Sequence, residues 1–262
     1  MKIAISGKGG VGKTTIAGIL ARILSRKGVN VLAIDADPSA NLGLTLAIPK
    51  DVLNGIIPIS ENYALIEKKT GARLDSYSVV FRLSFRVDDI VEKYTIKSPD
   101  GVNLLVMGSV KGAGEGCACP ANALIRSLLR HLIVKRNEAV IVDMEAGVEH
   151  LGRGTAEHVD CMLIITEPNV KSNEVAKKIY DLAKKLKIPK IFLVGNKIIT
   201  EKDKKILSTL DRAKKIIAFV PFDERIKHAD AVGNWQIDID EPSPGISKIQ
   251  ELLEILIEKS VK

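Results

Sequence analysis

Short apolar runs alternate with longer amphipathic segments along most of the chain. The apolar runs predict buried strands at Lys2–Ser6, Val31–Asp35, Val102–Met107, Ala139–Asp143, Cys161–Thr166, Ile191–Gly195 and Ile216–Val220. The segments between them have a helical period and predict helices at Lys13–Lys27, Ala121–Lys135, Val170–Lys187, Lys202–Leu210 and Ile246–Lys259. Strands that alternate with helices are typical of βαβ units, so we expect an α/β fold: a mostly parallel sheet with helices on both faces.

The pattern is weakest between residues 44 and 99. Glu61–Lys69 has a helical period, whereas Ser78–Val87 fits a strand or a helix equally well. We expect residues 1–262 to form one domain, in which residues 44–99 are an insertion that serves as a lid or as a dimer surface.

A glycine-rich loop joins the first predicted strand to the first predicted helix. It fits the phosphate-loop pattern G-x-x-x-x-G-K-S/T in the required context, and it consists of Gly7, Lys8, Gly9, Gly10, Val11, Gly12, Lys13, Thr14 and Thr15. Glycines let successive backbone N–H groups turn toward phosphate oxygens, and the following helix N-terminus attracts the same charge. The loop therefore predicts a P-loop NTPase in which Lys13 bridges the β- and γ-phosphates and the Thr14 hydroxyl ligates Mg²⁺.

Two predicted strands run into carboxylates. Asp35 and Asp37 lie at the end of one strand, and Asp143 ends another. Strand ends in such sheets face the nucleotide crevice. An apolar strand that ends in Asp fits the Walker B pattern, so we expect Asp143 to contact the ligands of Mg²⁺. For Asp35 two alternatives stay open: it supports Mg²⁺ through water, or it fixes the loop that follows the strand.

Lys8 gives the phosphate loop an additional feature. The form Lys-Gly-Gly-x-Gly-Lys-Thr resembles the deviant Walker A family, which includes nitrogenase iron protein, MinD, ParA and tail-anchored-protein targeting ATPases. The resemblance implies ATP hydrolysis in a nucleotide-dependent homodimer, with Lys8 reaching the partner's phosphates. It also implies that Asp37 orients the attacking water, and it makes Asp37 a further candidate for contact with Mg²⁺.

Base recognition rests on the same resemblance. Asn196 follows a predicted strand at the position where the family holds adenine by an amide, and Pro221 and Asp223 lie in a loop that closes over the base. An amide supplies the donor and the acceptor that a base edge needs. The alternative for Asn196 is an ordinary turn residue.

Two cysteines lie in a second glycine-rich loop. Cys117 and Cys119 are too close in sequence for an unstrained disulfide, but two thiolates can chelate a soft or borderline metal. They fill half of a four-coordinate site, and a symmetric dimer supplies the other half. The pair therefore indicates Ni²⁺ or Zn²⁺ bridging a dimer. The alternative is two small residues in a tight loop.

The segments Gly116–Pro120 and Asp143–Gly154 closely resemble the CooC family, the accessory ATPases that insert nickel into carbon monoxide dehydrogenase. The resemblance implies ATP-driven nickel delivery to apo carbon monoxide dehydrogenase or a related nickel enzyme. Nitrogenase iron protein is the nearest rival, but the position of its second cluster cysteine is His150 here. An iron–sulfur or redox carrier stays as an alternative.

The formal net charge of +7 permits an acidic partner, nucleic acid or an anionic membrane. The lysines are spread along predicted helices, and the polar positions of Ile249–Ile257 are largely acidic, so we expect that helix to pack on the domain and not on lipid. The chain begins without a signal-peptide core and has no apolar run of membrane-spanning length. We expect a cytoplasmic protein with no nucleic-acid or membrane partner. A MinD/ParA-type positioning ATPase is the alternative.

Overall fold

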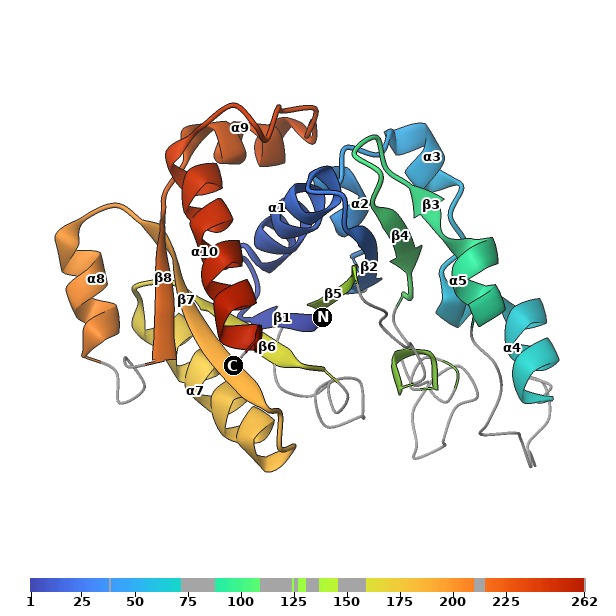
Figure 1. The fold of residues 1–262 in the computed structure, drawn as a ribbon, viewed down its shortest axis with the longest axis horizontal. Coiled ribbons are helices and arrows are strands. Elements are labelled where there is room, and N and C mark those ends of the chain that lie inside the picture. The colour runs from blue at the N-terminus through green and yellow to red at the C-terminus, as the bar shows by residue number, and fades with distance from the viewer. Residues whose placement is uncertain are drawn as a thin grey trace.

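The computed structural model describes residues 1–37, 39–71, 88–108, 124, 127–130, 137–145, 159–209 and 215–261. These residues form an eight-stranded sheet of order β3-β4-β2-β5-β1-β6-β7-β8 (Figure 1). The strands are β1 (Lys2–Gly7), β2 (Asn30–Ala36), β3 (Ile96–Lys97), β4 (Asn103–Val106), β5 (Glu138–Met144), β6 (Cys161–Thr166), β7 (Lys190–Ile198) and β8 (Ile216–Pro221). Neighbouring strands are parallel except for β3 with β4. The predicted α/β fold is confirmed.

The helices connect these strands and cover them. They are α1 (Lys13–Arg26), α2 (Leu42–Thr45), α3 (Lys50–Asn54), the 3-10 helix η1 (Ile59–Glu61), α4 (Tyr63–Thr70), α5 (Asp88–Tyr94), α7 (Val170–Lys185), α8 (Glu201–Ser208), α9 (Glu224–Val232) and α10 (Pro244–Val261). The sequence did not predict α2, α3, α5 or α9. The first three have only 4, 5 and 7 residues, which is too short to display a clear period. Of the predicted helix Ala121–Lys135, residues 124 and 127–130 are helical, and the rest lies outside the described residues, as does Ser78–Val87.

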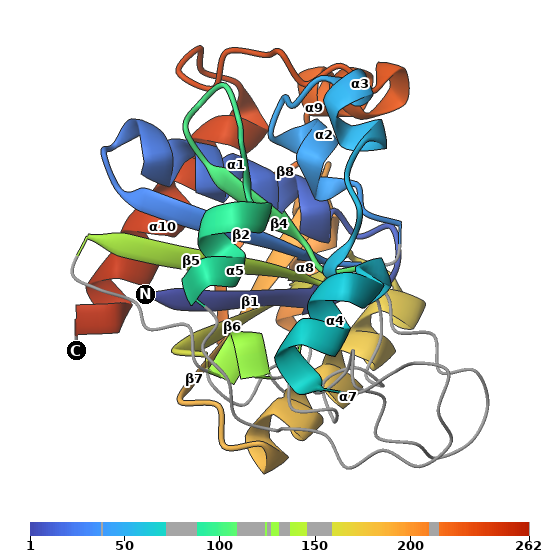
Figure 2. The ribbon, with the colours of Figure 1, turned by 90° about the vertical axis from the view of Figure 1, so that its right-hand side faces the viewer.

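Alternate residues of the central strands face two separate cores. Ile3 and Ile5 of β1 pack in one core with α1 and α10, while Ala4 lies in a second core with α4, α5 and α7. Successive side chains of a strand therefore point to opposite faces of the sheet. Both faces are apolar because helices cover both of them. Figure 2 shows the strands side by side, with α4 and α5 toward the viewer.

The insertion predicted at residues 44–99 contributes to these cores. Leu46 and Ile48 are buried in the first core, and Ile59, Ile66 and Ile90 are buried in the second. A role for this stretch as a lid or dimer surface stays a prediction.

The C-terminal helix α10 lies on the first face of the sheet. Its apolar positions Ile249, Leu252, Leu253 and Leu256 are fully buried, and the helix packs against β8 and α1. This confirms the prediction that it packs on the domain. Among the described residues no helix combines the length and the hydropathy needed to span a bilayer.

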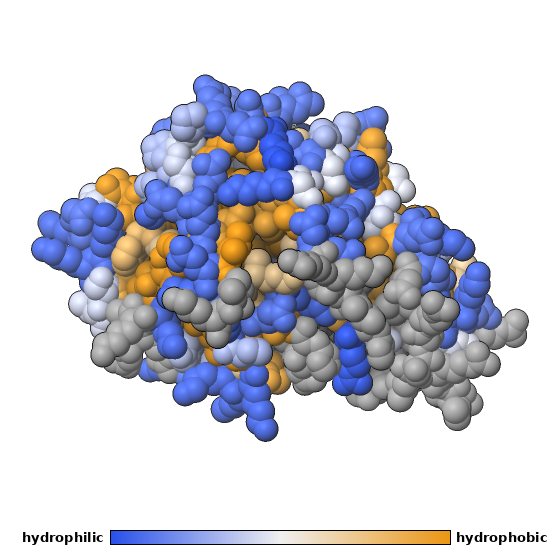
Figure 3. Space-filling view, in the orientation of Figure 1, coloured by the Kyte–Doolittle hydropathy of each residue, from blue (hydrophilic) through white to orange (hydrophobic). Residues whose placement is uncertain are grey.

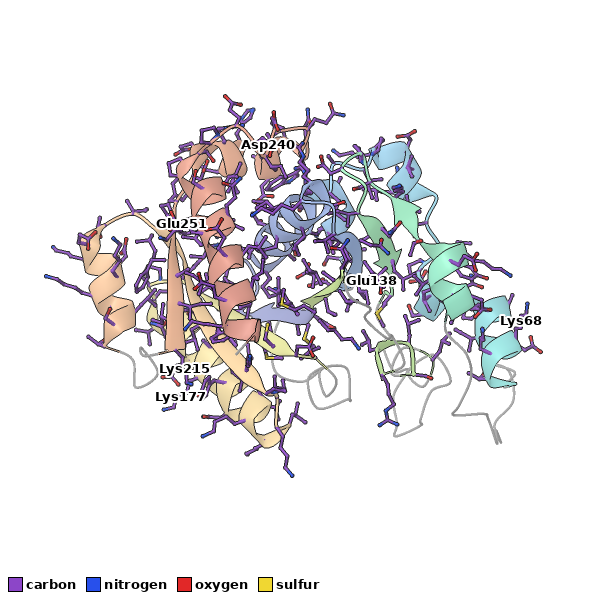
Figure 4. All side chains as sticks on the ribbon, viewed as in Figure 1. Lys68, Glu138, Lys177, Lys215, Asp240 and Glu251 are labelled. Carbon is purple, nitrogen blue, oxygen red and sulfur yellow. The ribbon has the colours of Figure 1, made fainter. Side chains whose placement is uncertain are left out.

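Charged side chains are distributed over the surface. Lys68, Lys177, Asp240 and Glu251 are exposed and project from different helices and loops (Figure 4). On the face shown in Figure 3, α8 presents mainly hydrophilic side chains.

Candidate nucleotide-binding site

The phosphate loop runs from the end of β1 to the start of α1, and two of its glycines permit close contacts. A Cβ atom at Gly7 would lie 2.4 Å from the carbonyl oxygen of Ile165, and one at Gly12 would lie 2.4 Å from Nδ2 of Asn196. Gly12 is also the N-cap of α1, with a left-handed φ of 90°. Only glycine fits this backbone without strain, so the loop can pack directly against β6 and β7.

The two lysines of the loop differ in burial. Lys13 is only 6% exposed, at the first turn of α1, and its charge favours the ionised form of Asp143. Lys8 is half-buried, and no described residue accepts a hydrogen bond from its ammonium. Its reach to a partner's phosphates stays a prediction.

Thr14 and Asp143 form the contact expected of a magnesium site. The Thr14 hydroxyl donates to Oδ2 of Asp143 at 2.6 Å. Asp143 is 0% exposed, and its other oxygen, Oδ1, is buried with no hydrogen-bond partner among the described residues. A buried carboxylate oxygen without a partner is costly unless a cation compensates it. A hydroxyl and a carboxylate are oxygen donors that suit Mg²⁺, so the residues present fit the ion.

Burial is the main cause that raises the pKa of Asp143 to about 7. The hydrogen bond from Thr14 and the charge of Lys13 act in the opposite direction, while the charges of Asp35 and Asp37 raise the pKa further. The ionised form of this carboxyl is therefore the form that a nearby cation would stabilise.

Asp35 and Asp37 shape the loop after β2. Asp35 is fully buried and accepts hydrogen bonds from the backbone N–H groups of Asp37, at 3.1 Å, and Leu42, at 2.9 Å. Burial, as the main cause, raises its pKa to about 6. These two hydrogen bonds support the alternative in which Asp35 fixes the loop. Oδ1 of Asp37 accepts from the N–H of Ser39 at 2.9 Å, and its action on water stays a prediction.

Asn196 contacts the phosphate loop. Its side chain is buried, and Nδ2 donates to the carbonyl of Val11 at 2.8 Å. The neighbouring Lys197 donates to the carbonyl of Gly10 at 2.6 Å and forms an ion pair of 2.7 Å with Glu167. The sequence indicated none of these contacts. The adenine-binding role of Asn196 stays a prediction.

Asp223 links the starts of two helices. One carboxylate oxygen accepts from the N–H groups of Arg225 and Ile226 and so caps α9. The other accepts from the Ser243 hydroxyl and the Gly245 N–H, where α10 begins. Burial raises the pKa of Asp223, but these hydrogen bonds outweigh it, so the pKa lies below its usual range. Contact of this loop, including Pro221, with a base stays a prediction.

Two further groups join α1 to α9 and to the chain that follows it. Arg22 is buried and donates to Asp100 and to the carbonyls of Trp235 and Ile237. Thr15 donates to Asp230 in a long contact of 3.4 Å. For Arg22 the one signal in the sequence is an arginine among the apolar positions of α1.

The predicted cysteine site lies outside the described residues, as do Cys117, Cys119 and His150. Within the part of the chain that the structure describes, no group of three His, Cys, Asp or Glu side chains is arranged to hold a metal. Cys161 is fully buried at the start of β6, and burial is the main cause that raises its pKa to about 12. A free cysteine in such a position packs as a small apolar side chain.

A glycine phosphate loop between β1 and α1 in a parallel sheet, facing a buried Asp on the neighbouring β5, defines a P-loop ATPase. The sequence profile of the CobQ/CobB/MinD/ParA nucleotide binding domain matches residues 2–237, and the chain belongs to this family. The predicted family is therefore confirmed.

Relatives resemble the chain over almost its whole length. It is 44% identical over 262 residues to the carbon monoxide dehydrogenase accessory protein CooC of Rhodospirillum rubrum, covering 99% of this chain and 97% of that protein. It is 41% identical over 260 residues to an uncharacterized ATP-binding protein of Methanocaldococcus jannaschii, covering 98% of each. The MinD cell division protein of Aquifex aeolicus has the same fold, with a TM-score of 0.69, 22% identity, and coverage of 98% of this chain and 96% of that one.

Proposed function

We propose that this ATPase works as a homodimer that couples ATP binding and hydrolysis to delivery of nickel to carbon monoxide dehydrogenase or a related nickel enzyme. The observation that carries the proposal is the 44% identity to CooC along 99% of the chain. The Cys117-x-Cys119 pair supplies the chemistry, because thiolates bind soft and borderline metals.

The nucleotide site supplies the driving reaction. Lys13 and the N-terminus of α1 would hold the phosphates, and Thr14 and Asp143 would hold Mg²⁺, which neutralises charge on the phosphates when bound. Asp37 would orient the attacking water, and Lys8 would act on the partner's nucleotide. Dimer closure would bring the two cysteine pairs together around the cargo metal, and hydrolysis would release the metal or the client enzyme.

Metal stoichiometry tests the cargo site. Equilibrium dialysis with Ni²⁺ and with Zn²⁺ should give one tightly held ion per dimer, because four ligands require two chains. Binding should release protons and weaken as the pH falls, since the thiols must be deprotonated. Cys117→Ala or Cys119→Ala should abolish tight binding, and the matched control Cys161→Ala should not. Tight binding in the Cys117→Ala, Cys119→Ala double variant would refute the assignment.

Sedimentation tests the dimer. In metal-free protein carrying the slow-hydrolysing substitution Asp37→Asn, ATP should convert monomer to dimer, whereas ADP should not. Lys8→Ala should bind ATP yet lose hydrolysis, because it removes a cation that acts in trans. An unchanged mass with and without ATP would count against the dimer. Iron with labile sulfide in the purified protein would favour the alternative of an iron–sulfur carrier.

A further inference from the structure

Two neighbouring side chains of β7 hold two neighbouring carbonyls of the phosphate loop. Nδ2 of Asn196 donates to the carbonyl of Val11 at 2.8 Å. Nζ of Lys197 donates to the carbonyl of Gly10 at 2.6 Å. The two bonds therefore fix two successive peptide groups in the phosphate loop, Gly10–Val11 and Val11–Gly12.

A trans peptide group points its C=O and its N–H in opposite directions. With the carbonyls of Gly10 and Val11 drawn toward β7, the N–H groups of Val11 and Gly12 must point away from β7. The Val11 N–H has only a long contact of 3.4 Å, to the carbonyl of Lys8 across the loop. The Gly12 N–H has no backbone acceptor among the described residues. Two successive N–H groups without strong acceptors form an anion-binding concavity.

The two side chains of β7 are themselves held in place. Lys197 pairs with Glu167 at 2.7 Å, and Glu167 also accepts from the Asn169 amide at 3.1 Å. Lys197 has a left-handed φ of 57°, where the pairing of β7 with β8 is irregular. A non-glycine residue keeps this conformation only when its surroundings enforce it. Asn196 is fixed by burial and by its close approach to Gly12.

We infer that Asn196 and Lys197 are positioning residues that pre-organise the phosphate loop for the polyphosphate chain of its ligand. The inference rests on nucleotide binding by the loop, and it does not depend on nickel delivery. Without these bonds the peptide groups that follow Gly10 and Val11 are free to rotate, and the entropy lost when they are ordered would oppose binding.

Binding of inorganic tripolyphosphate with Mg²⁺ tests the inference, because this probe has phosphates and no base. Calorimetry should show that Lys197→Met and Asn196→Leu each weaken tripolyphosphate and ATP binding by a similar factor of about ten, the range expected for a lost charged or buried hydrogen bond. In Lys197→Met the ratio of ATP to GTP affinity should not change. Lys197→Arg, which keeps a donor, should restore most of the affinity.

Lys202→Met is the matched control, because it removes the same charge from an exposed position on α8. It should leave the affinity for both probes unchanged. Thermal unfolding without ligand should confirm that every variant is folded. Weaker ATP binding with unchanged tripolyphosphate binding in Asn196→Leu would mean that Asn196 acts on the base. Unchanged affinities in Lys197→Met would overturn the inference for Lys197. If the cysteine variants bind metal normally, nickel delivery fails while this inference stands.

Discussion

The ends of β2 and β5 carry the same side chain in the same register, with different surroundings. Asp35 and Asp143 are paired across the two strands. Both are 0% exposed, and burial is the main cause that raises their pKa values, to about 6 and about 7. Asp35 receives backbone N–H donors on both of its oxygens. Asp143 has one oxygen bonded to Thr14 and one without a partner among the described residues.

This difference separates a carboxylate that holds the fold from one that is left to bind an ion. A carboxylate whose oxygens are all engaged by backbone groups stabilises the loop that supplies those groups. A buried oxygen without a partner reduces stability, and such a group persists where binding compensates it.

The largest effect should follow Lys13→Ala. Lys13 is buried beside Asp143, where it would contact the transferred phosphate. The change should abolish ATP hydrolysis, with a loss of about a thousandfold or more, and weaken nucleotide binding. Phosphate release and calorimetry measure the two quantities. Full activity would mean that Lys13 does not contact the transferred phosphate.

Two matched substitutions should give opposite results at the two strand ends. Asp143→Asn should lower Mg²⁺-dependent hydrolysis by about a hundredfold or more, because the ion loses a charged contact. It should leave the stability of the ligand-free protein unchanged or higher, since a buried carboxylate without a full set of partners is removed.

Asp35→Asn should have its main effect on stability. Both oxygens of Asp35 accept hydrogen bonds from backbone N–H groups. Asn carries an NH₂ group in place of one of these oxygens, so two donors would face each other, which should cost about 1–3 kcal/mol of unfolding free energy. Denaturant unfolding and hydrolysis assays on both variants complete the test. A loss of activity without a loss of stability at Asp35 would show that it too serves the metal.

The sequence predicted both strand ends and the loop between β1 and α1, because apolar runs and the glycine pattern are local signals. It could not separate the roles of Asp35 and Asp143. Their difference depends on which donors lie nearby, and Thr14 is 129 residues from Asp143 along the chain. For the same reason Asn196 was interpreted from the family pattern alone, while its bond to Val11 spans 185 residues.

Asp223 is another carboxylate in which both oxygens accept hydrogen bonds. It joins the N-termini of α9 and α10 through four donors. Asp223→Ala should lower the free energy of unfolding by about 1–2 kcal/mol, the cost of a lost helix cap. The neighbouring exposed Glu224 is the control, and Glu224→Ala should have little effect. Unchanged stability together with weaker ATP binding would instead support contact with the base.

The smallest effect is expected at Cys161, a buried titratable group that stays neutral. It lies at the start of β6, and its pKa is raised from 9.0 to about 12, chiefly by burial. The thiol therefore contributes stability that is present below pH 9 and is lost as the pH rises from about 9 toward 12.

Because the thiolate is the reactive form, iodoacetamide at pH 8 should not label Cys161 in the folded protein. Labelling should appear only on unfolding, so any earlier modification must fall on the other two thiols. Mass mapping of the alkylated peptides measures this. Cys161→Ala should leave hydrolysis unchanged, since a neutral buried side chain remote from the phosphate loop makes no contact that the reaction uses. Rapid labelling of Cys161 in native protein would show that β6 opens readily, which would contradict the burial that raises the pKa of this thiol.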